Sequence, residues 1–386
     1  MVPEQRPMPF GSHGFAYPAG TIRPSGAQAD LDAAVARVYD GWKAAYVVAG
    51  CGGHYVRTGG GTGSSSAITV SEGHGYGMIA VAMMAGHDPE AQSIFDGFVR
   101  VFRAFPSSLN QGLMSWAIGP DCKAVNGPNS ATDGDLDIAF ALLLAHRQWG
   151  SGGAVDYLGE ANRLIRAIES SEMNRHTHLP LLGDWAASAS FYYATRPSDF
   201  MPDHFRAFAT VSGRPKWKNA VESVYLLVSD IQQGFSPQAG LLPDFVIETE
   251  LAPRPAAPNF LEGSKDGAYG WNSCRVPWRL GTDFIASGDE RAKAALERIN
   301  TWITAQTGGD PEKISAGYDL AGGALERWNS PAFIAPLGVA AVVDARHQAW
   351  LDPIWAWLVA DDGGEYYADS IKLLSMLVIS GNWWAP

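Results

Sequence analysis

The sequence predicts an all-α protein in which about twelve helices pair into a closed toroid. Three observations lead to this fold class. Helical hydrophobic periodicity recurs along the 386 residues, alternating Val, Ile and Thr runs that indicate strands are nearly absent, and no clear linker divides the chain. No repeat of fixed period is evident, which argues against a solenoid.

The expected helices are separated by loops rich in Gly, Pro, Ser and Asn. Asp88 stands before Pro89 and Glu90 as a cap before a first-turn proline, and Gly150 and Gly213 stand where two helices stop. In chain order the expected helices are 28–49, 74–86, 88–104, 134–148, 154–170, 199–212, 215–233, 275–287, 289–306, 331–343, 347–360 and 365–380.

The whole chain, 1–386, is expected to form one domain, with 1–27 as an extended N-terminal arm that is polar and carries Pro and Gly. The Pro-rich stretch 251–258 is interpreted as a long loop, because a helical pattern resumes soon after it. The strongest apolar run, 138–146, is too short for a membrane helix, so no membrane association is expected.

Charge and cysteine content exclude several classes of protein. The formal net charge of −12 disfavours nucleic acid as a partner and suits a neutral or cationic ligand. Cys51, Cys122 and Cys274 are odd in number and form no CxxC pair, so we expect three free thiols, with at most one bridge possible. The histidines form no HExxH or similar set, and neither a metal nor a cofactor is expected.

The first segment with chemical potential is Ser-Glu-Gly-His-Gly-Tyr-Gly at 71–77. Its single carboxylate, Glu72, precedes a helix and has the apolar neighbours Val70 and Met78, which can raise its pKa as a general acid requires. The glycines would let a polymer approach closely. An equally good reading of Glu72 alone is an acid that interacts with the helix dipole.

The second segment is Ala-Thr-Asp-Gly-Asp-Leu-Asp-Ile-Ala at 131–139. A calcium loop would need Gly at its sixth position and Glu at its twelfth, where this chain has Ile138 and Leu144. Asp133, Asp135 and Asp137 exceed what helix capping requires, so at least one is expected in a cleft.

The third segment, 260–279, combines aromatic residues, acids and arginines around Asn272. Together the three segments resemble glycoside hydrolase family 8, and the resemblance runs through nearly the whole chain. Further matches are Leu-Gly-Asp-Trp at 182–185, Thr-Arg-Pro-Ser-Asp at 195–199 and Ser-Gly-Asn-Trp-Trp at 380–384. The resemblance implies an (α/α)6 barrel and an inverting, endo-acting glycoside hydrolase.

By this resemblance, Glu72 matches the general acid and Asp133 the acid that binds and distorts the sugar at the cleavage point. The usual base of the family is an Asp where this chain has Asn272. This departure resembles the chitosanase and lichenase branch, whose base is a Glu in an upstream loop. Glu262 matches that Glu, and Asp266 remains the alternative base.

Four aromatic residues are candidates for stacking on sugars, with Asn272 and Arg275 as further substrate-binding candidates. For each aromatic residue a role in the core is about as probable on sequence grounds. The four are Tyr76, Trp116, Trp185 and Trp271. Arg275 is alternatively a residue that orients the site, and Arg196 is expected to pair with Asp199 ahead of a helix.

The leading function predicted is that of a chitosanase cleaving β-1,4 glucosamine linkages, with an endo-β-glucanase acting on lichenan or carboxymethylcellulose as the alternative. Ala186 follows Trp185 where similar chitosanases have an acid, which weighs against chitosan. A carbohydrate-binding pseudoenzyme is the remote alternative, since Glu72 and a base are present. A polysaccharide substrate implies a secreted or periplasmic monomer, although no export signal is visible.

Overall fold

The computed structural model describes residues 6–59, 66–187 and 191–386, and these form twelve α-helices, as predicted. The helices are α1 (Gln28–Tyr46), α2 (Ser71–Met83), α3 (Ala91–Ala104), α4 (Thr132–Trp149), α5 (Tyr157–Ser171), α6 (Pro202–Ser212), α7 (Lys216–Gly234), α8 (Val276–Ser287), α9 (Glu290–Thr307), α10 (Pro331–Val342), α11 (Gln348–Ala360) and α12 (Tyr366–Ile379). Most ends lie within three residues of the predicted ones.

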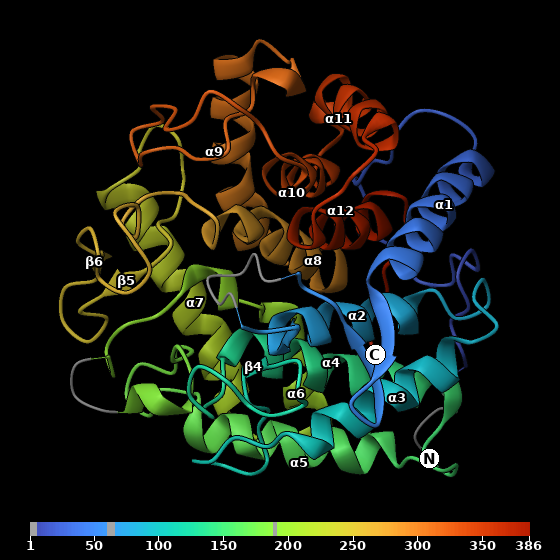
Figure 1. The fold of residues 1–386 in the computed structure, drawn as a ribbon. Coiled ribbons are helices and arrows are strands. Elements are labelled where there is room, and N and C mark those ends of the chain that lie inside the picture. Colours follow the sequence, from blue (N-terminus) through green and yellow to red (C-terminus); the bar gives the residue numbers. More distant parts are fainter. Residues whose placement is uncertain (1–5, 60–65, 188–190) are drawn as a thin grey trace.

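The even-numbered helices form a closed inner ring (Figure 1). Helix α2 packs on α4, α4 on α6, α6 on α8, α8 on α10 and α10 on α12, and α12 packs back on α2. Each odd-numbered helix covers an inner one from outside: α3 covers α2, α5 covers α4, α7 covers α6, α9 covers α8, α11 covers α10 and α1 covers α12. The predicted (α/α)6 barrel is confirmed.

Burial distinguishes the two rings. Every residue of α4 from Thr132 to Ala145 is buried, because inner helices contact neighbours on all sides. The outer helix α9 buries only a stripe with helical spacing, which includes Leu296, Ile299 and Ile303. Among the described residues, no helix combines the length and apolar character needed to span a membrane.

Glycines bring α2 and α4 unusually close together. A Cβ on Gly75 would lie 2.6 Å from the Asp137 Cβ, and a Cβ on Gly134 would lie 2.4 Å from the Ser71 Oγ. The glycines of the 71–77 segment therefore serve helix packing, and the expectation that they admit a polymer is wrong for Gly75. This close contact sets the first turns of α2 and α4 side by side.

Within the described ranges, six short strands form three antiparallel pairs in the segments between helices. The pairs are β1 (Val47–Gly50) with β2 (Gly53–Val56), β3 (Thr69–Val70) with β4 (Ala117–Ile118), and β5 (Val246–Ile247) with β6 (Arg254–Pro255). The Pro-rich stretch 251–258 contains the return strand of the β5–β6 hairpin. It is a loop of the barrel and not a linker.

One cysteine prediction is wrong. Cys51, in the turn between β1 and β2, forms a disulfide with Cys122, in the loop after β4, and only Cys274 is a buried free thiol. The two bonded cysteines are 71 residues apart in sequence. The odd number of cysteines therefore did not exclude a disulfide, and only the folded structure shows which two cysteines are bonded.

Candidate active site

The N-terminal ends of several inner helices meet around one buried arginine. Arg275, just before α8, is 1% exposed. Its Nη1 donates to the Glu72 Oε2 at 2.9 Å, the Asp133 Oδ2 at 2.9 Å and the Tyr76 hydroxyl at 3.1 Å. Glu72 lies in the first turn of α2 and Asp133 in the first turn of α4. Glu72, Tyr76 and Asp133 thus all accept hydrogen bonds from the same arginine, which is distant from them in sequence.

The other nitrogens of Arg275 are also directed to protein atoms. Its Nη2 donates to the Ser198 Oγ and the Asn272 Oδ1, each at 3.0 Å, and its Nε donates to the Asn272 carbonyl at 3.2 Å. A buried guanidinium whose three nitrogens all have protein partners is poorly placed to bind a sugar. The structure therefore favours the orienting role for Arg275 over the predicted contact with substrate.

Glu72 has the electrostatics of a proton donor. Its side chain is 16% exposed, and its Oε1 accepts a hydrogen bond from the Tyr366 hydroxyl at 3.1 Å. Burial raises the pKa of Glu72 to about 7, and the neighbouring Asp133 adds to the rise, although Arg275 opposes it. At neutral pH a substantial fraction of Glu72 is therefore protonated.

Asp133 has the opposite character. Burial by itself would raise its pKa, but the positive charges of Arg275 and Arg196 outweigh that effect and hold the pKa below its usual value. Its Oδ1 also accepts from the Gly134 N–H at 2.9 Å. Asp133 is thus a fixed anion beside a carboxyl group that is partly protonated at neutral pH, and the two acids are suited to different tasks.

Glu262 lies on the loop between β6 and α8, with 48% of its side chain exposed. Its Oε2 accepts from the Asn272 Nδ2 at 2.7 Å, and its Oε1 accepts from the Arg196 Nη2 at 3.2 Å. Since Asn272 also accepts from Arg275, it connects Glu262 to the arginine that holds Glu72. Glu262 is therefore held in position and still reached by water.

The alternative base, Asp266, is only 3% exposed. Its carboxylate accepts from the backbone N–H groups of Leu261, Glu262 and Gly263 at 2.7, 3.1 and 2.9 Å. Asp266 therefore holds the loop that carries Glu262, and its own position gives solvent little access. The geometry favours Glu262 over Asp266 as the residue that contacts water.

Arg196 was expected to pair with Asp199, and it does so only at the long distance of 4.0 Å. It lies nearer to Glu262, at 3.2 Å, and to Asp133, at 3.7 Å. Arg196 thus links Asp133 to Glu262. Arg196 therefore belongs to the carboxylate cluster formed by Glu72, Asp133 and Glu262, and it does more than pair with Asp199.

Of the predicted stacking residues, Trp271 is the most accessible. Its side chain, 36% exposed, lies 5.8 Å from the ring of Trp328, which is 50% exposed. Tyr76 is fully buried against Trp278, so a stacking role for Tyr76 is wrong and its place is in the core.

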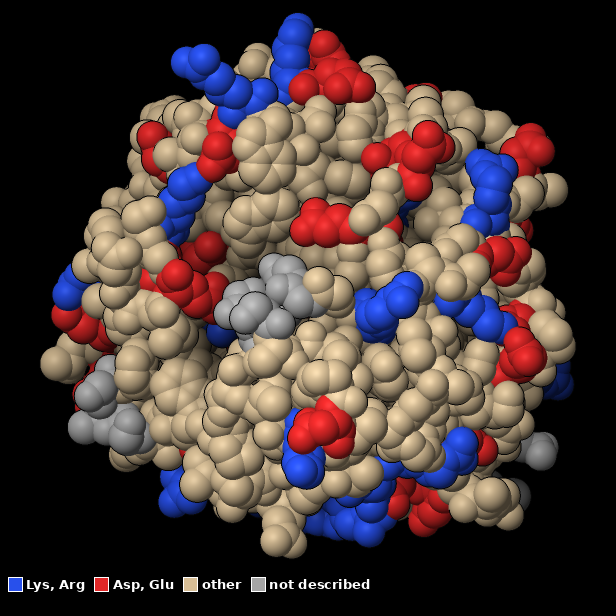
Figure 2. Space-filling view, in the orientation of Figure 1, with Lys and Arg blue, Asp and Glu red and all other residues tan. Residues whose placement is uncertain are grey.

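The other two predicted tryptophans remain partly exposed. The Trp116 Nε1 donates to the Asn126 carbonyl at 3.2 Å, and Trp185 meets Phe191 edge to face with centroids 5.1 Å apart. Each retains an open part of its ring. Figure 2 shows a hollow above and to the left of the centre of this face, bordered by acidic side chains.

The family model described as glycosyl hydrolases family 8 matches residues 25–381. The chain belongs to family 8. It is 43% identical over 378 residues to a beta-glucanase of Niallia circulans, a match covering 97% of this chain and 91% of the relative. An endoglucanase of Bacillus sp. strain KSM-330 is 39% identical, with 95% and 80% covered.

A solved structure agrees closely with this fold. The apo beta-1,3-1,4-glucanase from Paenibacillus sp. X4 superposes with a TM-score of 0.94 at 42% identity, covering 99% of this chain and all of that chain. Membership of family 8 makes this protein a glycoside hydrolase, as the sequence motifs predicted.

Several residues of this family 8 site escaped sequence reasoning. Tyr366 binds Glu72, and Trp328 completes the exposed pair with Trp271. Asp244 accepts from the backbone N–H groups of Gly270, Asn272 and Ser273 and so shapes the turn before Arg275. The two consecutive tyrosines at the start of α12 could have identified Tyr366 as a candidate from the sequence. Asp244, a single Asp in a long loop, offered no such signal.

The described residues of this glycosidase contain no group of three or more His, Cys, Asp or Glu side chains placed to hold a metal ion. His74, two residues after Glu72 in sequence, is fully buried and its Nε2 lies 2.8 Å from the Phe98 carbonyl oxygen. Burial lowers the pKa of His74 to about 4. His74 is therefore a core residue that points away from the carboxylates.

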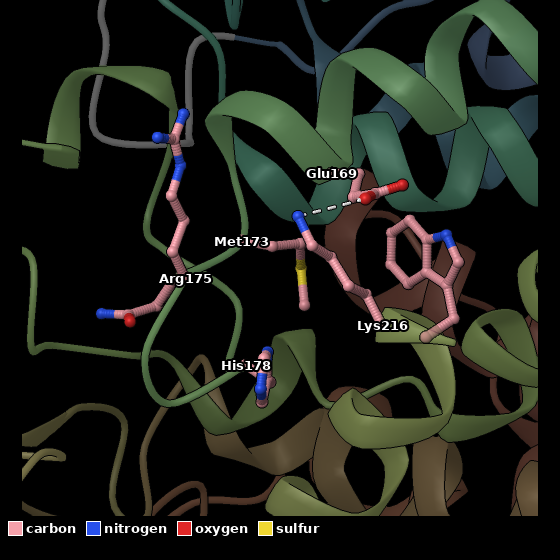
Figure 3. A pocket seen from close by; sticks show the side chains of 7 residues that line it. Glu169, Met173, Arg175, His178 and Lys216 are labelled. Atoms are coloured by element: carbon pink, nitrogen blue, oxygen red, sulfur yellow. Dashed lines mark ion pairs between the residues drawn. The ribbon is translucent and has the colours of Figure 1, made fainter. Parts of the chain in front are cut away.

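A separate small pocket near the end of α5 does not compete as a site (Figure 3). Its volume is about 10 Å³, which suits roughly one water molecule. Its acid, Glu169, forms an ion pair with Lys216 at 3.3 Å and another with Arg214. These two ion pairs already engage the Glu169 carboxylate, so this pocket is not a second candidate active site.

Proposed function

We propose that this family 8 enzyme is an inverting endo-β-glucanase that cleaves mixed β-1,3-1,4-glucan. One observation carries the inverting mechanism: Glu72 and Glu262 are connected, and kept from direct contact, by the Arg275–Asn272 pair. Inverting hydrolysis needs two carboxyl groups roughly 6.5–9.5 Å apart, so that a water molecule fits beside the sugar.

Each carboxyl group then has its own task. Glu72 donates its proton to the leaving glycosidic oxygen, which its pKa of about 7 allows near neutral pH. Glu262, open to solvent and held by Asn272, takes a proton from the attacking water. Asp133, kept anionic by Arg275 and Arg196, accepts hydrogen bonds from sugar hydroxyls and favours the distorted ring.

The substrate proposal replaces chitosan, the leading prediction, with β-glucan, its alternative. The relatives described above are named as beta-glucanase, endoglucanase and beta-1,3-1,4-glucanase. Ala186 stands where similar chitosanases have an acid, and its methyl side chain offers no carboxylate to a glucosamine ammonium. Both features support a neutral sugar chain, and the acid and base together argue against a pseudoenzyme.

The deciding experiment compares lichenan, barley β-glucan, carboxymethylcellulose and chitosan, with reducing ends and product anomers measured together. We expect fastest release from the mixed-linkage glucans, α-anomeric products, and loss of activity by at least about 10²-fold in Glu72→Gln and Glu262→Gln. Faster release from chitosan would overturn the substrate proposal. Full activity in Glu262→Gln would remove Glu262 as the base and direct attention to Asp266.

We also infer that the enzyme works outside the cytoplasm as a monomeric single domain with 1–27 as its arm. The Cys51–Cys122 disulfide supports an oxidising compartment, and a polymeric substrate requires one that the chain can reach. Sedimentation would test the monomer.

A further inference from the structure

A second and larger pocket opens beside the β5–β6 hairpin, which Figure 1 shows at the left margin of the barrel. Its volume is about 370 Å³, within the range of small-ligand sites. The residues that line it include Tyr193, Ala194, Ile247, Glu250, Leu251 and Phe260. None of them belongs to the carboxylate cluster.

The walls of this hairpin pocket continue into the candidate active site. Ala194 lies two residues before Arg196, and Phe260 lies two residues before Glu262. Arg196 and Glu262 form an ion pair with each other. Two extended residues span at most about 7 Å, so the Phe260 wall lies within roughly that length of chain from Glu262, and the Ala194 wall lies within it from Arg196.

The pocket is built on fixed structure. Thr195 and Val246 exchange two backbone hydrogen bonds of 2.9 Å, which tie the Ala194 wall to strand β5. The ring of Phe260 packs against Phe191 and Phe245, with centroids 5.4 and 5.9 Å away. Both walls are therefore anchored in the scaffold, and the pocket exists without a bound partner.

The lining combines apolar surfaces with carboxylate acceptors. Leu251, which is 88% exposed at the end of the hairpin, contributes an apolar side chain to the lining. Tyr193 offers an aromatic ring, and Glu250 offers a carboxylate. A pyranose ring has both an apolar face and a rim of hydroxyl donors, so it complements this arrangement.

We propose that the hairpin pocket binds a glucose unit of the glucan chain, outside the units held at the carboxylates. The proposal rests on the proposed function, since it assigns the next part of the same polymer. Glu248 is paired with Arg254, which leaves Glu250 as the acceptor for sugar hydroxyls. The pocket would thereby favour long chains over short ones.

The test uses the Glu72→Gln protein, in which cleavage is blocked, with oligosaccharides of three to eight glucose units prepared from lichenan. Binding is measured by calorimetry for this protein and for the same protein with Tyr193→Ala, Glu250→Gln or Leu251→Ser added. Leu226→Ser is the matched control, because Leu226 is 66% exposed on α7, away from the pocket. Melting temperatures confirm that each variant is folded.

We expect each pocket variant to weaken binding of the longest oligosaccharides by about tenfold while the shortest bind unchanged, and Leu226→Ser to alter neither. Equal weakening for every length, or no weakening at all, would overturn the pocket assignment while wild-type hydrolysis of glucan upheld the proposed function. Stronger Glu250-dependent binding of glucosamine oligomers would overturn the choice of a neutral sugar. If the wild-type enzyme hydrolyses no glucan, the proposed function fails first.

Discussion

The hydroxyl of Tyr366 is one of the groups that limit the rise in the pKa of Glu72. Tyr366 donates to Glu72, which stabilises the ionised carboxylate and lowers its pKa, whereas burial raises it to about 7. The acid works only when protonated, so activity is expected to fall as pH rises through the pKa of Glu72. The hydrogen bond therefore reduces the protonated fraction of Glu72 at neutral pH, while it fixes the orientation of the carboxyl group.

Replacing Tyr366 with Phe removes that hydrogen bond and leaves the ring. We expect the pKa of Glu72 to rise and the alkaline limb of kcat/KM to move up by about one pH unit, because a hydrogen bond to a charged group is worth about 1.5–3 kcal/mol. The pH–rate profile measures this. A limb that moves to lower pH would show that Tyr366 acts in another way.

Asn272 stands where related enzymes carry their base, and here it donates to Glu262. The substitution Asn272→Asp replaces this donor with a second carboxylate, so we expect kcat on lichenan to fall about 10- to 100-fold. In the Glu262→Gln background the same Asp faces the site without a competitor and should restore at least about tenfold over Glu262→Gln alone. Asn272→Ala in that background is the control and should restore nothing.

At the scale of elements, the contact between α2 and α4 depends on glycine. A Cβ at Gly75 would press on Asp137, so Gly75→Ala is expected to destabilise the protein by about 1–3 kcal/mol. Gly41 in α1 meets nothing within 4 Å, and Gly41→Ala should stabilise it by roughly 0.5–1 kcal/mol. Chemical denaturation measures the free energy of unfolding of both variants. An equal change in the two variants would contradict this account of Gly75.

The helices were easier to predict from the sequence than the contacts between them. The twelve helices followed from periodicity and stop signals, because those depend on local residues. The positions of Glu72 and Asp133 at helix starts could also be predicted from the residues around them. The disulfide, the burial of Tyr76 and the central place of Arg275 depend on how distant segments meet, which no local pattern encodes.

At the scale of the whole molecule, a group of buried acids limits stability at high pH. Asp135 and Glu172 are fully buried, and the like charge of Asp184 acts on both. Burial, together with these like charges, raises the pKa of both Asp135 and Glu172 well above the ordinary values of 3.8 and 4.5. The folded protein therefore keeps protons that the unfolded chain loses.

The consequence is a loss of stability as pH rises above about 4.5, continuing until the raised pKa values are passed. Asp135→Asn removes one titrating group, so its melting temperature should fall less steeply than that of the wild type between pH 5 and 9. Asp230→Asn, at an exposed position on α7, is the control and should keep the wild-type slope. Parallel curves for wild type and Asp135→Asn would disprove this coupling.

The closed inner ring has no first or last member. Helix α12 meets α2 in the same way that each inner helix meets the next, and Arg147 contacts the carbonyl oxygens of both Arg6 and Ala385. The two ends of the described chain therefore meet at one side chain. A circular permutant, with these ends linked and new ends opened in the surface loop at 151–153, would keep every inner contact in place.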